Sequence, residues 1–553
     1  MRPLTPSAHI DTFARDRLPP PGEWPELDLA GLGYPDRLNA AVELLDTTIA
    51  HRGANRPCLR AGDGTTLTYG QVRERVDRIA HALVDDLGVV PGNRVLLRGP
   101  NNPALVLCWL AALKAGAVVV TTMPLLRRHE LRTVGHDAAV RLALCDTRHT
   151  GDLLAAGVEG LRVVTFGEDS AELEELARDK PARFSAVPTA ADDVALIAFT
   201  SGTSGQPKAT AHFHRDVLAI ADTFSAHVLR PTPDDVFAGS PPLAFTYGLG
   251  GMVVFPLRAG ACSVLLERAG PEELFGAVSR LGVTVLFTAP TAYRAVLPSI
   301  EGHDLRGLRR CVSAGEALPA DTWHRFHDAT GLRIVDGIGA TEMLHVFISA
   351  AEDDIRPGAT GRPVPGYTAA VVDDDGLPVP DGVPGRLAVR GPTGCRYLSD
   401  PRQREYVRDG WNITGDTYVR DPDGYFWYQA RSDDMIVSAG YNIAAPEVEN
   451  ALLRHPAVAE CAVVGAPDPD RGQVVKAYVV LAAGTAAAPG LVTELQDFAK
   501  REIAPYKYPR AVEFVARLPR TGTGKLQRAL LPERLTDVGR PAVGSGAARA
   551  ATT

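Results

Sequence analysis

From about Leu67 onward, segments whose apolar residues recur at helical spacing alternate with short apolar runs. Residues 71–87 predict a helix with one apolar side, formed by Val72, Val76, Ile79 and Leu83. A buried strand is predicted at 94–97, and the order of helix and strand repeats at 105–115 and 117–121. Further strands are predicted at 194–199, 263–266, 283–287 and 333–336. Because parallel strands need long crossover connections, usually helical, this rhythm predicts a parallel sheet with helices on both faces.

The last third of the sequence has a different pattern. From Ala369, short strands and Gly/Pro turns predict a small β-rich subdomain. After Arg431, the apolar pattern predicts a compact α+β module with strands at 435–437, 458–464 and 474–481 and helices at 446–453 and 491–502.

These changes of pattern divide the 553 residues into domains. We expect an α/β fold in which a large N-terminal domain, 1–431, contains parallel-sheet subdomains and the β-rich subdomain at about 369–431. A short hinge, 432–434, leads to a small α+β domain, 435–538. The final residues, 539–553, are rich in Gly, Ala and Ser and are expected to be disordered.

Charge and cysteine content narrow the classes of partner and the cellular location. The chain has 66 acidic and 58 basic residues, a balance that gives no support for a nucleic-acid-binding surface. The N-terminus has no apolar signal core, and the most apolar stretches are interrupted by Lys or Gly, so no membrane span is expected. Seven widely spaced cysteines without a CxxC pair favour reduced thiols. A cytoplasmic location is therefore the expectation.

A Gly/Ser/Thr-rich segment directly after the strand predicted at 194–199 is the strongest candidate site. Its glycines, Gly202 and Gly205, let backbone N–H groups converge on an anion. Hydroxyl groups and one cation complete the segment: Thr200, Ser201, Thr203, Ser204 and Lys208. This combination predicts a polyphosphate-binding loop, although it lacks the GxxxxGK[ST] pattern of a Walker loop.

Five segments in order along the chain resemble the motifs of one enzyme superfamily: residues 199–208, 336–342, 411–416, 430–434 and 519–525. The chain is similar to the acyl-adenylate-forming enzymes, which include acyl-CoA synthetases, peptide-synthetase adenylation domains and luciferases. The resemblance covers nearly the whole chain. It implies the acyl-CoA synthetase-like fold and the transfer of AMP from ATP to a carboxylate, which needs charge neutralisation because both reactants are anions.

The resemblance also implies roles for individual residues. Thr341 contacts the α-phosphate, Glu342 and Thr203 hold Mg²⁺, and catalytic Lys525 meets both the carboxylate and the α-phosphate. Asp416 accepts from the ribose hydroxyls, and Arg431 contacts the ribose and phosphate side. The adenine lies against residues of two segments: Gly315, Glu316 and Ala317, and Asp336, Gly337 and Ile338. Ile338 stands where the superfamily usually has Tyr, so an aliphatic face would pack on the adenine.

A second half-reaction follows from the same resemblance. In these enzymes the C-terminal domain rotates about a hinge residue, here Asp433, after the adenylate has formed. The rotation withdraws the catalytic lysine and brings Gly440 and Tyr441 to the active site, where they line a tunnel for the thiol of CoA.

Within the superfamily, the chain most resembles benzoate-CoA and 2-aminobenzoate-CoA ligases. The resemblance implies an aromatic carboxylic acid substrate in a pocket formed by Phe245, Thr246, Tyr247, Ala289, Gly339 and His345. The Thr246 hydroxyl either contacts a ring substituent or serves packing only. His345 is likewise either a packed core residue or a substrate contact.

Several alternatives stay open from the sequence. The adenylate could be passed to a carrier protein instead of CoA, or the activated oxyacid could be nitrite, for diazotisation of an aryl amine. A nucleotide-binding regulator without turnover is the alternative from another class. The presence of Lys525, Glu342 and Asp416 argues against it. The resemblance also suggests a homodimer.

Overall fold

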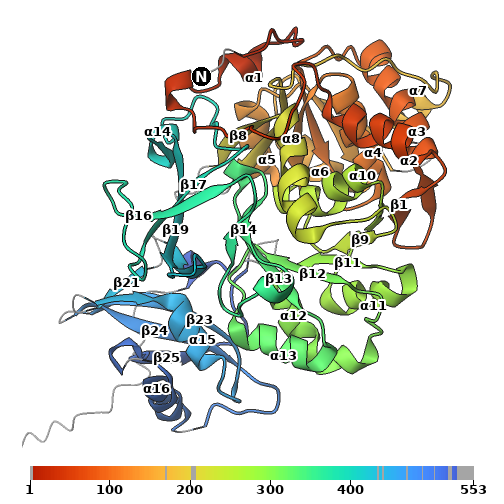
Figure 1. Cartoon of the computed structure of the whole chain (residues 1–553). Coiled ribbons are helices and arrows are strands. Elements are labelled where there is room, and N and C mark those ends of the chain that lie inside the picture. Colours follow the sequence, from red (N-terminus) through yellow and green to blue (C-terminus); the bar gives the residue numbers. More distant parts are fainter. Residues whose placement is uncertain are drawn as a thin grey trace, which may run out of the picture. The chain divides into compact units, whose positions relative to one another are not determined.

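The computed structural model describes residues 4–167, 171–200, 207–431, 435–438, 441–468, 471–488, 490–503, 505–520 and 526–531. The chain divides into two compact units, Met1–Tyr428 and Gln429–Thr553 (Figure 1). The predicted hinge, 432–434, and the predicted disordered tail, 539–553, both lie outside the described residues.

The first unit contains a sheet of six described strands in the order β6-β5-β3-β4-β7-β8. Neighbours in this order are parallel, except that β8 is antiparallel to β7. The connection between β7 and β8 is too short for a crossover, so β8 can only return alongside its neighbour. The strands are β3 (Arg94–Arg98), β4 (Val118–Thr122), β5 (Leu142–Asp146), β6 (Arg162–Phe166), β7 (Val194–Thr200) and β8 (Lys208–Phe213).

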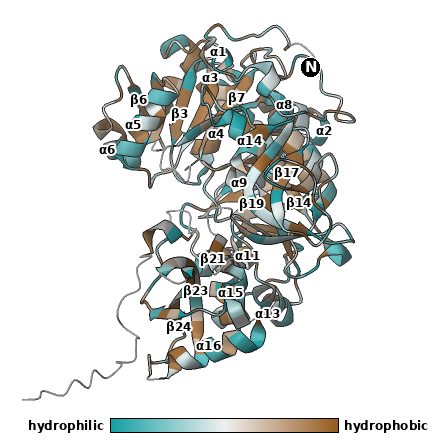
Figure 2. Ribbon diagram, turned by 90° about the vertical axis from the view of Figure 1, so that its left-hand side faces the viewer, coloured by the Kyte–Doolittle hydropathy of each residue, from teal (hydrophilic) through white to brown (hydrophobic). Residues whose placement is uncertain are grey.

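Both faces of this sheet are buried, as the apolar run in β3 requires. Val95 and Leu97 belong to the hydrophobic cluster that includes the residues of helix α4 (Pro103–Lys114), and α4 packs against α3 (Tyr69–His81). Leu96, between them, instead packs in the cluster of α5 (Arg128–Asp137). In Figure 2 the hydrophobic colour concentrates on strands such as β3. The predicted parallel sheet with helices on both faces is thus confirmed.

The second sheet of this unit has nine described strands in the order β15-β14-β13-β12-β11-β9-β10-β1-β2. The strands from β1 to β13 in this order are parallel, and β2, β14 and β15 are antiparallel to their neighbours. The strands are β1 (Pro57–Ala61), β2 (Thr66–Thr68), β9 (Val236–Gly239), β10 (Cys262–Leu265), β11 (Val285–Thr288), β12 (Arg310–Ala314), β13 (Ile334–Gly339), β14 (Val346–Ser349) and β15 (Arg362–Pro363).

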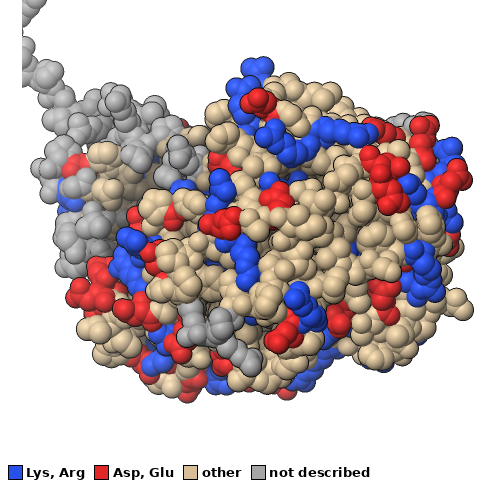
Figure 3. All heavy atoms as spheres, turned by 90° about the horizontal axis from the view of Figure 1, so that it is seen from above, with Lys and Arg blue, Asp and Glu red and all other residues tan. Residues whose placement is uncertain are grey.

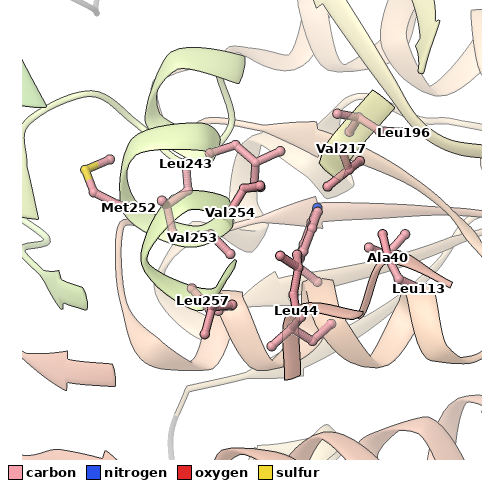
Figure 4. Packing of buried hydrophobic residues seen from close by; sticks show 14 of the residues in the cluster. Ala40, Leu44, Leu113, Leu196, Val217, Leu243, Met252, Val253, Val254 and Leu257 are labelled. Atoms are coloured by element: carbon pink, nitrogen blue, oxygen red, sulfur yellow. The ribbon is translucent and has the colours of Figure 1, made fainter. Parts of the chain in front are cut away.

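Two layers of helix pack against this second sheet. Helices α11 (Pro271–Leu281), α12 (Pro290–Val296) and α13 (Ala320–Thr330) share one hydrophobic cluster with it. The opposite face of the sheet packs in the larger hydrophobic cluster, which also contains residues of α3 and α4. Figure 4 shows part of this larger cluster, in which Leu44 and Leu113 pack with Val254 and Leu257. A single core thus connects the two sheets.

The β-rich subdomain predicted from Ala369 is also present. Its described strands form a five-stranded sheet, and the resolved pairings are antiparallel. They are β16 (Thr368–Val372), β17 (Gly385–Arg390), β18 (Val407–Arg408), β19 (Trp411–Arg420) and β20 (Phe426–Arg431).

The C-terminal unit has its own core, built as the sequence predicts for an α+β module. Ile436, Val463 and Val475 of its sheet pack against Val448 and Leu495 of its two helices. The elements are β21 (Met435–Ser438), β22 (Tyr441–Ala444), α15 (Ala445–Leu452), β23 (Val458–Asp468), β24 (Gly472–Leu481), α16 (Leu491–Glu502) and β25 (Ala511–Phe514).

The N-terminal segment is anchored by the carboxylate of Asp193, which lies just before β7. Asp193 is buried and accepts hydrogen bonds from the hydroxyl of Ser7, from the N–H of Ala8 at 3.0 Å and from the guanidinium of Arg15 at 3.2 Å. Ala14 is fully buried. Residues 7–15 are therefore an integral part of the first unit.

Among the residues that the structure describes, no helix is both long enough and apolar enough to cross a bilayer. All seven cysteines are buried as free thiols. On the face seen in Figure 3, acidic and basic side chains are intermingled.

Candidate active site

Strands β7 and β8 bring the two ends of the predicted phosphate loop together. Thr200, the last residue of β7, pairs with Lys208, the first residue of β8. The five loop residues between them that we predict to bind phosphate lie outside the described residues: Ser201, Gly202, Thr203, Ser204 and Gly205. The strand pair therefore provides the frame, and phosphate binding by the loop stays a prediction.

The alternation of side chains along β8 separates core residues from site residues. Ala211 and Phe213 are buried in the hydrophobic cluster beneath the sheet. Lys208, Thr210 and His212 point to the opposite face. His212 is fully buried and contacts the backbone of Thr341, and burial lowers the pKa of its imidazole to about 4. His212 is thus neutral at neutral pH and can serve as a hydrogen-bonding group.

Thr341 and Glu342 follow β13 in a short 3₁₀ turn, Thr341–Met343. Glu342 is 8% exposed, and its Oε1 accepts a hydrogen bond from the hydroxyl of Tyr397. Burial and the charge of Glu342 raise the pKa of Tyr397 far above its usual value. The phenol therefore stays protonated and acts as a hydrogen-bond donor. The Nζ atom of Lys208 lies 5.1 Å from the centre of the Tyr397 ring, within the range of a cation–π contact. Tyr397 thus connects the predicted metal ligand with the phosphate-loop lysine.

The parallel strands of the second sheet bring further predicted site residues to one edge. Phe245 lies beyond the end of β9, Ala289 follows β11, Gly315 follows β12, and Gly339 ends β13. Because the carboxyl ends of parallel strands share an edge, these residues lie along the edge at which open α/β sheets bind ligands. Gly315 and Ala317 are exposed there, and Glu316 is half-buried.

Asp336 on β13 is the most strongly perturbed carboxyl group at this edge. Burial raises its pKa to about 8, against the opposing effects of the Gly337 backbone and the Ser313 hydroxyl. Ser313 is its neighbour on β12. The Oδ1 atom of Asp336 is buried and has no hydrogen-bond partner among the described residues. A largely protonated carboxyl group with one unpartnered oxygen suits a ligand that presents both a donor and an acceptor. Gly337 and Ile338 follow it on the same strand, and Ile338 packs partly against the core.

Asp416 lies on β19, and its charge acts on a tyrosine that Asp336 also affects. Tyr418, two residues further along the strand, is buried, and its hydroxyl lies 3.3 Å from the Thr360 hydroxyl. Its pKa is raised by burial and by the charges of both Asp416 and Asp336. Two different sheets thus bring Asp416, the predicted ribose contact, and Asp336, a predicted adenine contact, close to Tyr418.

The predicted aromatic-acid residues surround a helical segment and one histidine. Thr246 is buried at the start of α9 (Thr246–Leu249), which continues through a π-helical turn, Gly250–Val254, into α10 (Phe255–Ala259). The Nε2 atom of His345 lies 3.3 Å from the backbone oxygen of Tyr247. The imidazole also packs against aromatic rings at centroid distances of 4.6 Å to Phe255, 5.4 Å to Phe224, 5.5 Å to Tyr247 and 6.5 Å to Phe287.

His345 has the environment of a core residue. It is 2% exposed, and burial lowers its pKa to about 3. A Cβ added to Gly250 would lie 2.7 Å from its Nε2 atom, so glycine at this position allows the helix to approach the ring. The Nδ1 atom is buried without a hydrogen-bond partner in the described part of the chain. This packing favours a structural role for His345, and direct contact with a substrate stays a prediction.

The remaining predicted site residues belong to the second unit or its border. Arg431 ends β20 and Tyr441 begins β22, and only the backbone of each is described. The hinge residue Asp433, the tunnel residue Gly440 and the catalytic Lys525 lie outside the described residues. Their roles stay predictions.

Tyr397 and His212 lie at the candidate site, although neither was predicted from the sequence. Tyr397 is separated from Glu342 by 55 residues, and strands β9 to β17 lie between Lys208 and Tyr397 in the sequence. An antiparallel bridge between Thr210 and Tyr397 brings these segments together. For His212 a signal did exist, because Lys208, Thr210 and His212 are polar at alternate positions of an otherwise apolar strand.

The described donors fit a nucleotide with a divalent cation. A carboxylate, a hydroxyl and backbone oxygens are the hard ligands that Mg²⁺ prefers. Glu342 supplies the carboxylate, and the predicted hydroxyl ligand, Thr203, lies outside the described residues. Lys208 provides a positive charge for a phosphate group. Asp336 provides an orphaned polar atom for a base.

Two sheets whose edges present these groups define a nucleotide-binding α/β enzyme. The chain belongs to the AMP-binding enzyme family: residues 45–397 match that family, and residues 447–525 match its C-terminal domain. A benzoate–CoA ligase from Thauera aromatica is 37% identical over 511 residues, which cover 89% of this chain and 95% of that protein.

Solved structures agree with this assignment. An anthranilate CoA ligase, AuaEII, in complex with anthranoyl-AMP matches with a TM-score of 0.85 and 35% identity, over 90% of this chain and 97% of that one. A benzoate CoA ligase from Burkholderia xenovorans LB400 matches with a TM-score of 0.82 and 34% identity, over 89% and 99%. The predicted superfamily and fold class are confirmed.

Proposed function

We propose that the protein joins an aromatic carboxylic acid to CoA in two steps, with ATP as the second substrate of the first. The acid attacks the α-phosphorus of ATP to give an acyl-AMP and pyrophosphate. The thiol of CoA then displaces AMP to give the thioester. The observation that carries this proposal is that Tyr397 contacts both Lys208, the predicted phosphate-binding cation, and Glu342, the predicted metal ligand.

The first step joins two anions, so the residues must offset their repulsion. Lys208 and the hydroxyls of the phosphate loop hold the phosphates, and Thr341 contacts the α-phosphate. Glu342 binds Mg²⁺, which neutralises phosphate charge when it is present. Asp416 and Arg431 hold the ribose side, and Asp336 faces the base. Lys525 supplies the second cation at the reacting atoms.

The second step needs a different set of residues. Rotation about Asp433 withdraws Lys525 and admits the thiol beside Gly440 and Tyr441. The α+β fold of the C-terminal unit, with a core of its own, supports movement of this unit as one body.

An aromatic acid is the substrate that best suits the residues at the carboxyl edge. Phe245 and Tyr247 offer flat apolar surface, and Thr246 offers one buried hydroxyl. The relatives named above act on benzoate or anthranilate, according to their names. Use of a carrier protein, a homodimeric state and a cytoplasmic location stay predictions from the sequence.

Pyrophosphate release across a panel of benzoic acids, with and without CoA, tests the proposal. We expect release with a benzoate or an aminobenzoate and formation of the aryl-CoA when CoA is added. Release without any aromatic acid, or release that follows nitrite, would rule out the aryl–CoA ligase. An acyl-AMP that forms but never reacts with CoA would redirect the second step to another acceptor.

A further inference from the structure

Tyr397 is held rigidly between the two charged groups that it contacts. Its side chain is fully buried, and its ring packs against Tyr406 at a centroid distance of 5.8 Å. Its backbone N–H donates to Oε1 of Gln403 at 2.9 Å. Gln403 is itself buried and donates to the backbone oxygens of Glu23 and Cys395. The ring therefore has little freedom to turn.

The hydroxyl of Tyr397 also compensates a buried charge. A carboxylate as enclosed as Glu342 is costly to bury unless hydrogen bonds stabilise it. The phenol donates to Oε1, and a hydrogen bond to an ionised acceptor is stronger than one between neutral groups. Because the two oxygens of a carboxylate diverge, a bond that fixes Oε1 also fixes the direction of Oε2.

We propose that Tyr397 is a positioning residue for the adenylation step, a role that rests on the proposed function. Its hydroxyl orients the Glu342 carboxylate towards the divalent cation that accompanies ATP. Its ring face supports the ammonium group of Lys208 on the side of the phosphates. One side chain thus sets the separation between the metal ligand and the phosphate cation.

If Tyr397 served packing alone, removal of its hydroxyl would not change metal binding. Phenylalanine would fill nearly the same volume and keep the ring beside Lys208, so Tyr397→Phe removes only the hydroxyl. Loss of a group that orients a metal ligand typically weakens metal binding about 10–100-fold. A purely structural hydroxyl would lower stability and leave metal affinity unchanged. Tyr69→Phe is the matched control, because Tyr69 is equally buried and donates to the backbone oxygen of Ala261 at 2.8 Å.

The experiment measures Mn²⁺ binding to the full chain by electron paramagnetic resonance, in the presence of a non-hydrolysable ATP analogue. We expect Tyr397→Phe to weaken Mn²⁺ binding about 10-fold. Tyr69→Phe should leave it unchanged. In turnover, excess Mg²⁺ should restore kcat of Tyr397→Phe while the Mg²⁺ concentration at half-maximal rate stays raised. Tyr397→Leu, which also removes the ring, should weaken binding of the ATP analogue without metal.

A double-mutant cycle with Glu342→Gln identifies the group through which Tyr397 acts. Tyr397→Phe should add little further loss of Mn²⁺ affinity to Glu342→Gln. This double variant buries no uncompensated carboxylate at the site. If the single Tyr397→Phe variant does not fold, the double variant can therefore still be compared with Glu342→Gln. Additive losses would overturn the proposal.

The outcomes separate this inference from the proposed function. Unchanged Mn²⁺ affinity in Tyr397→Phe, with a loss in Glu342→Gln, would refute the role of Tyr397 alone. Unchanged affinity in both variants would remove Glu342 as the metal ligand and the inference with it. Pyrophosphate release by the unmodified protein tests the reaction itself, independently of either residue.

Discussion

Gly250→Ala is expected to destabilise the protein, mainly through a clash with His345. The added Cβ would lie 2.7 Å from Nε2 of His345 and 3.2 Å from Cζ of Phe255. The ring cannot easily retreat, because Phe224, Tyr247 and Phe255 surround it.

The magnitude follows from two opposing effects. Overpacking of a close-packed core costs about 1–3 kcal/mol, and the rigid surroundings favour the upper half of that range. Alanine in place of glycine in a helix contributes about 1 kcal/mol in the other direction. The free energy of unfolding should therefore fall by about 1–2 kcal/mol. In a His345→Ala background the main obstacle is gone, so the same substitution should become neutral or stabilising.

Urea denaturation followed by circular dichroism measures the four proteins of this double-mutant cycle. Gly276→Ala is the control, because Gly276 lies in α11 and an added Cβ there meets no atom within 4 Å. It should stabilise by about 0.5–1 kcal/mol in either background. If Gly250→Ala behaves like Gly276→Ala, or if its effect is the same with and without the imidazole, the contact is not the cause.

Three further predictions concern titration, catalysis and specificity. The raised pKa of Asp336 means that the folded state binds its proton more tightly than the unfolded state, so stability should fall as pH rises from about 4 through 8. Asp336→Asn should flatten this decline in urea titrations between pH 4 and 9, and an unaltered pH profile would contradict the assigned burial. Lys525→Ala should slow pyrophosphate release at least about 10²–10³-fold and spare thioester formation from pre-made acyl-AMP, so equal losses would refute rotation of the C-terminal domain. Thr246→Ala should change the ratio of kcat/KM between aminobenzoate and benzoate, and a constant ratio would leave Thr246 a packing role only.

The fold was largely predictable because its strands are buried on both faces. The apolar run at 94–97 and the helix at 105–115 became β3 and α4 with shifts of one or two residues. Extended π-helical segments such as Ala221–Leu229 were not predictable, because the π-helix leaves no distinct period in a short apolar sequence. The antiparallel course of β8 was not predicted either, although the short turn before it requires that course.

The candidate site was predictable only where its residues are contiguous in the sequence. Thr341 and Glu342 stand in one recognisable segment, as do Thr200 and Lys208. The contact between Glu342 and Tyr397 depends on a bridge between β8 and the β-rich subdomain, and no local pattern encodes a pairing over that separation. The environment of His345 likewise arises from four rings on three separate segments of the chain.

The anchoring of the N-terminal segment on Asp193 has a consequence for synthesis. Ser7 and Asp193 are separated by 186 positions, so during translation Ser7 must wait for its partner. At about 5–20 residues per second, that delay is roughly 10–40 s. Meanwhile the strands β3 to β6 can already pair, and the arrival of Asp193 then fastens the start of the chain next to β7. The segment around Ser7 is thus secured later than the strands that precede Asp193 in the sequence.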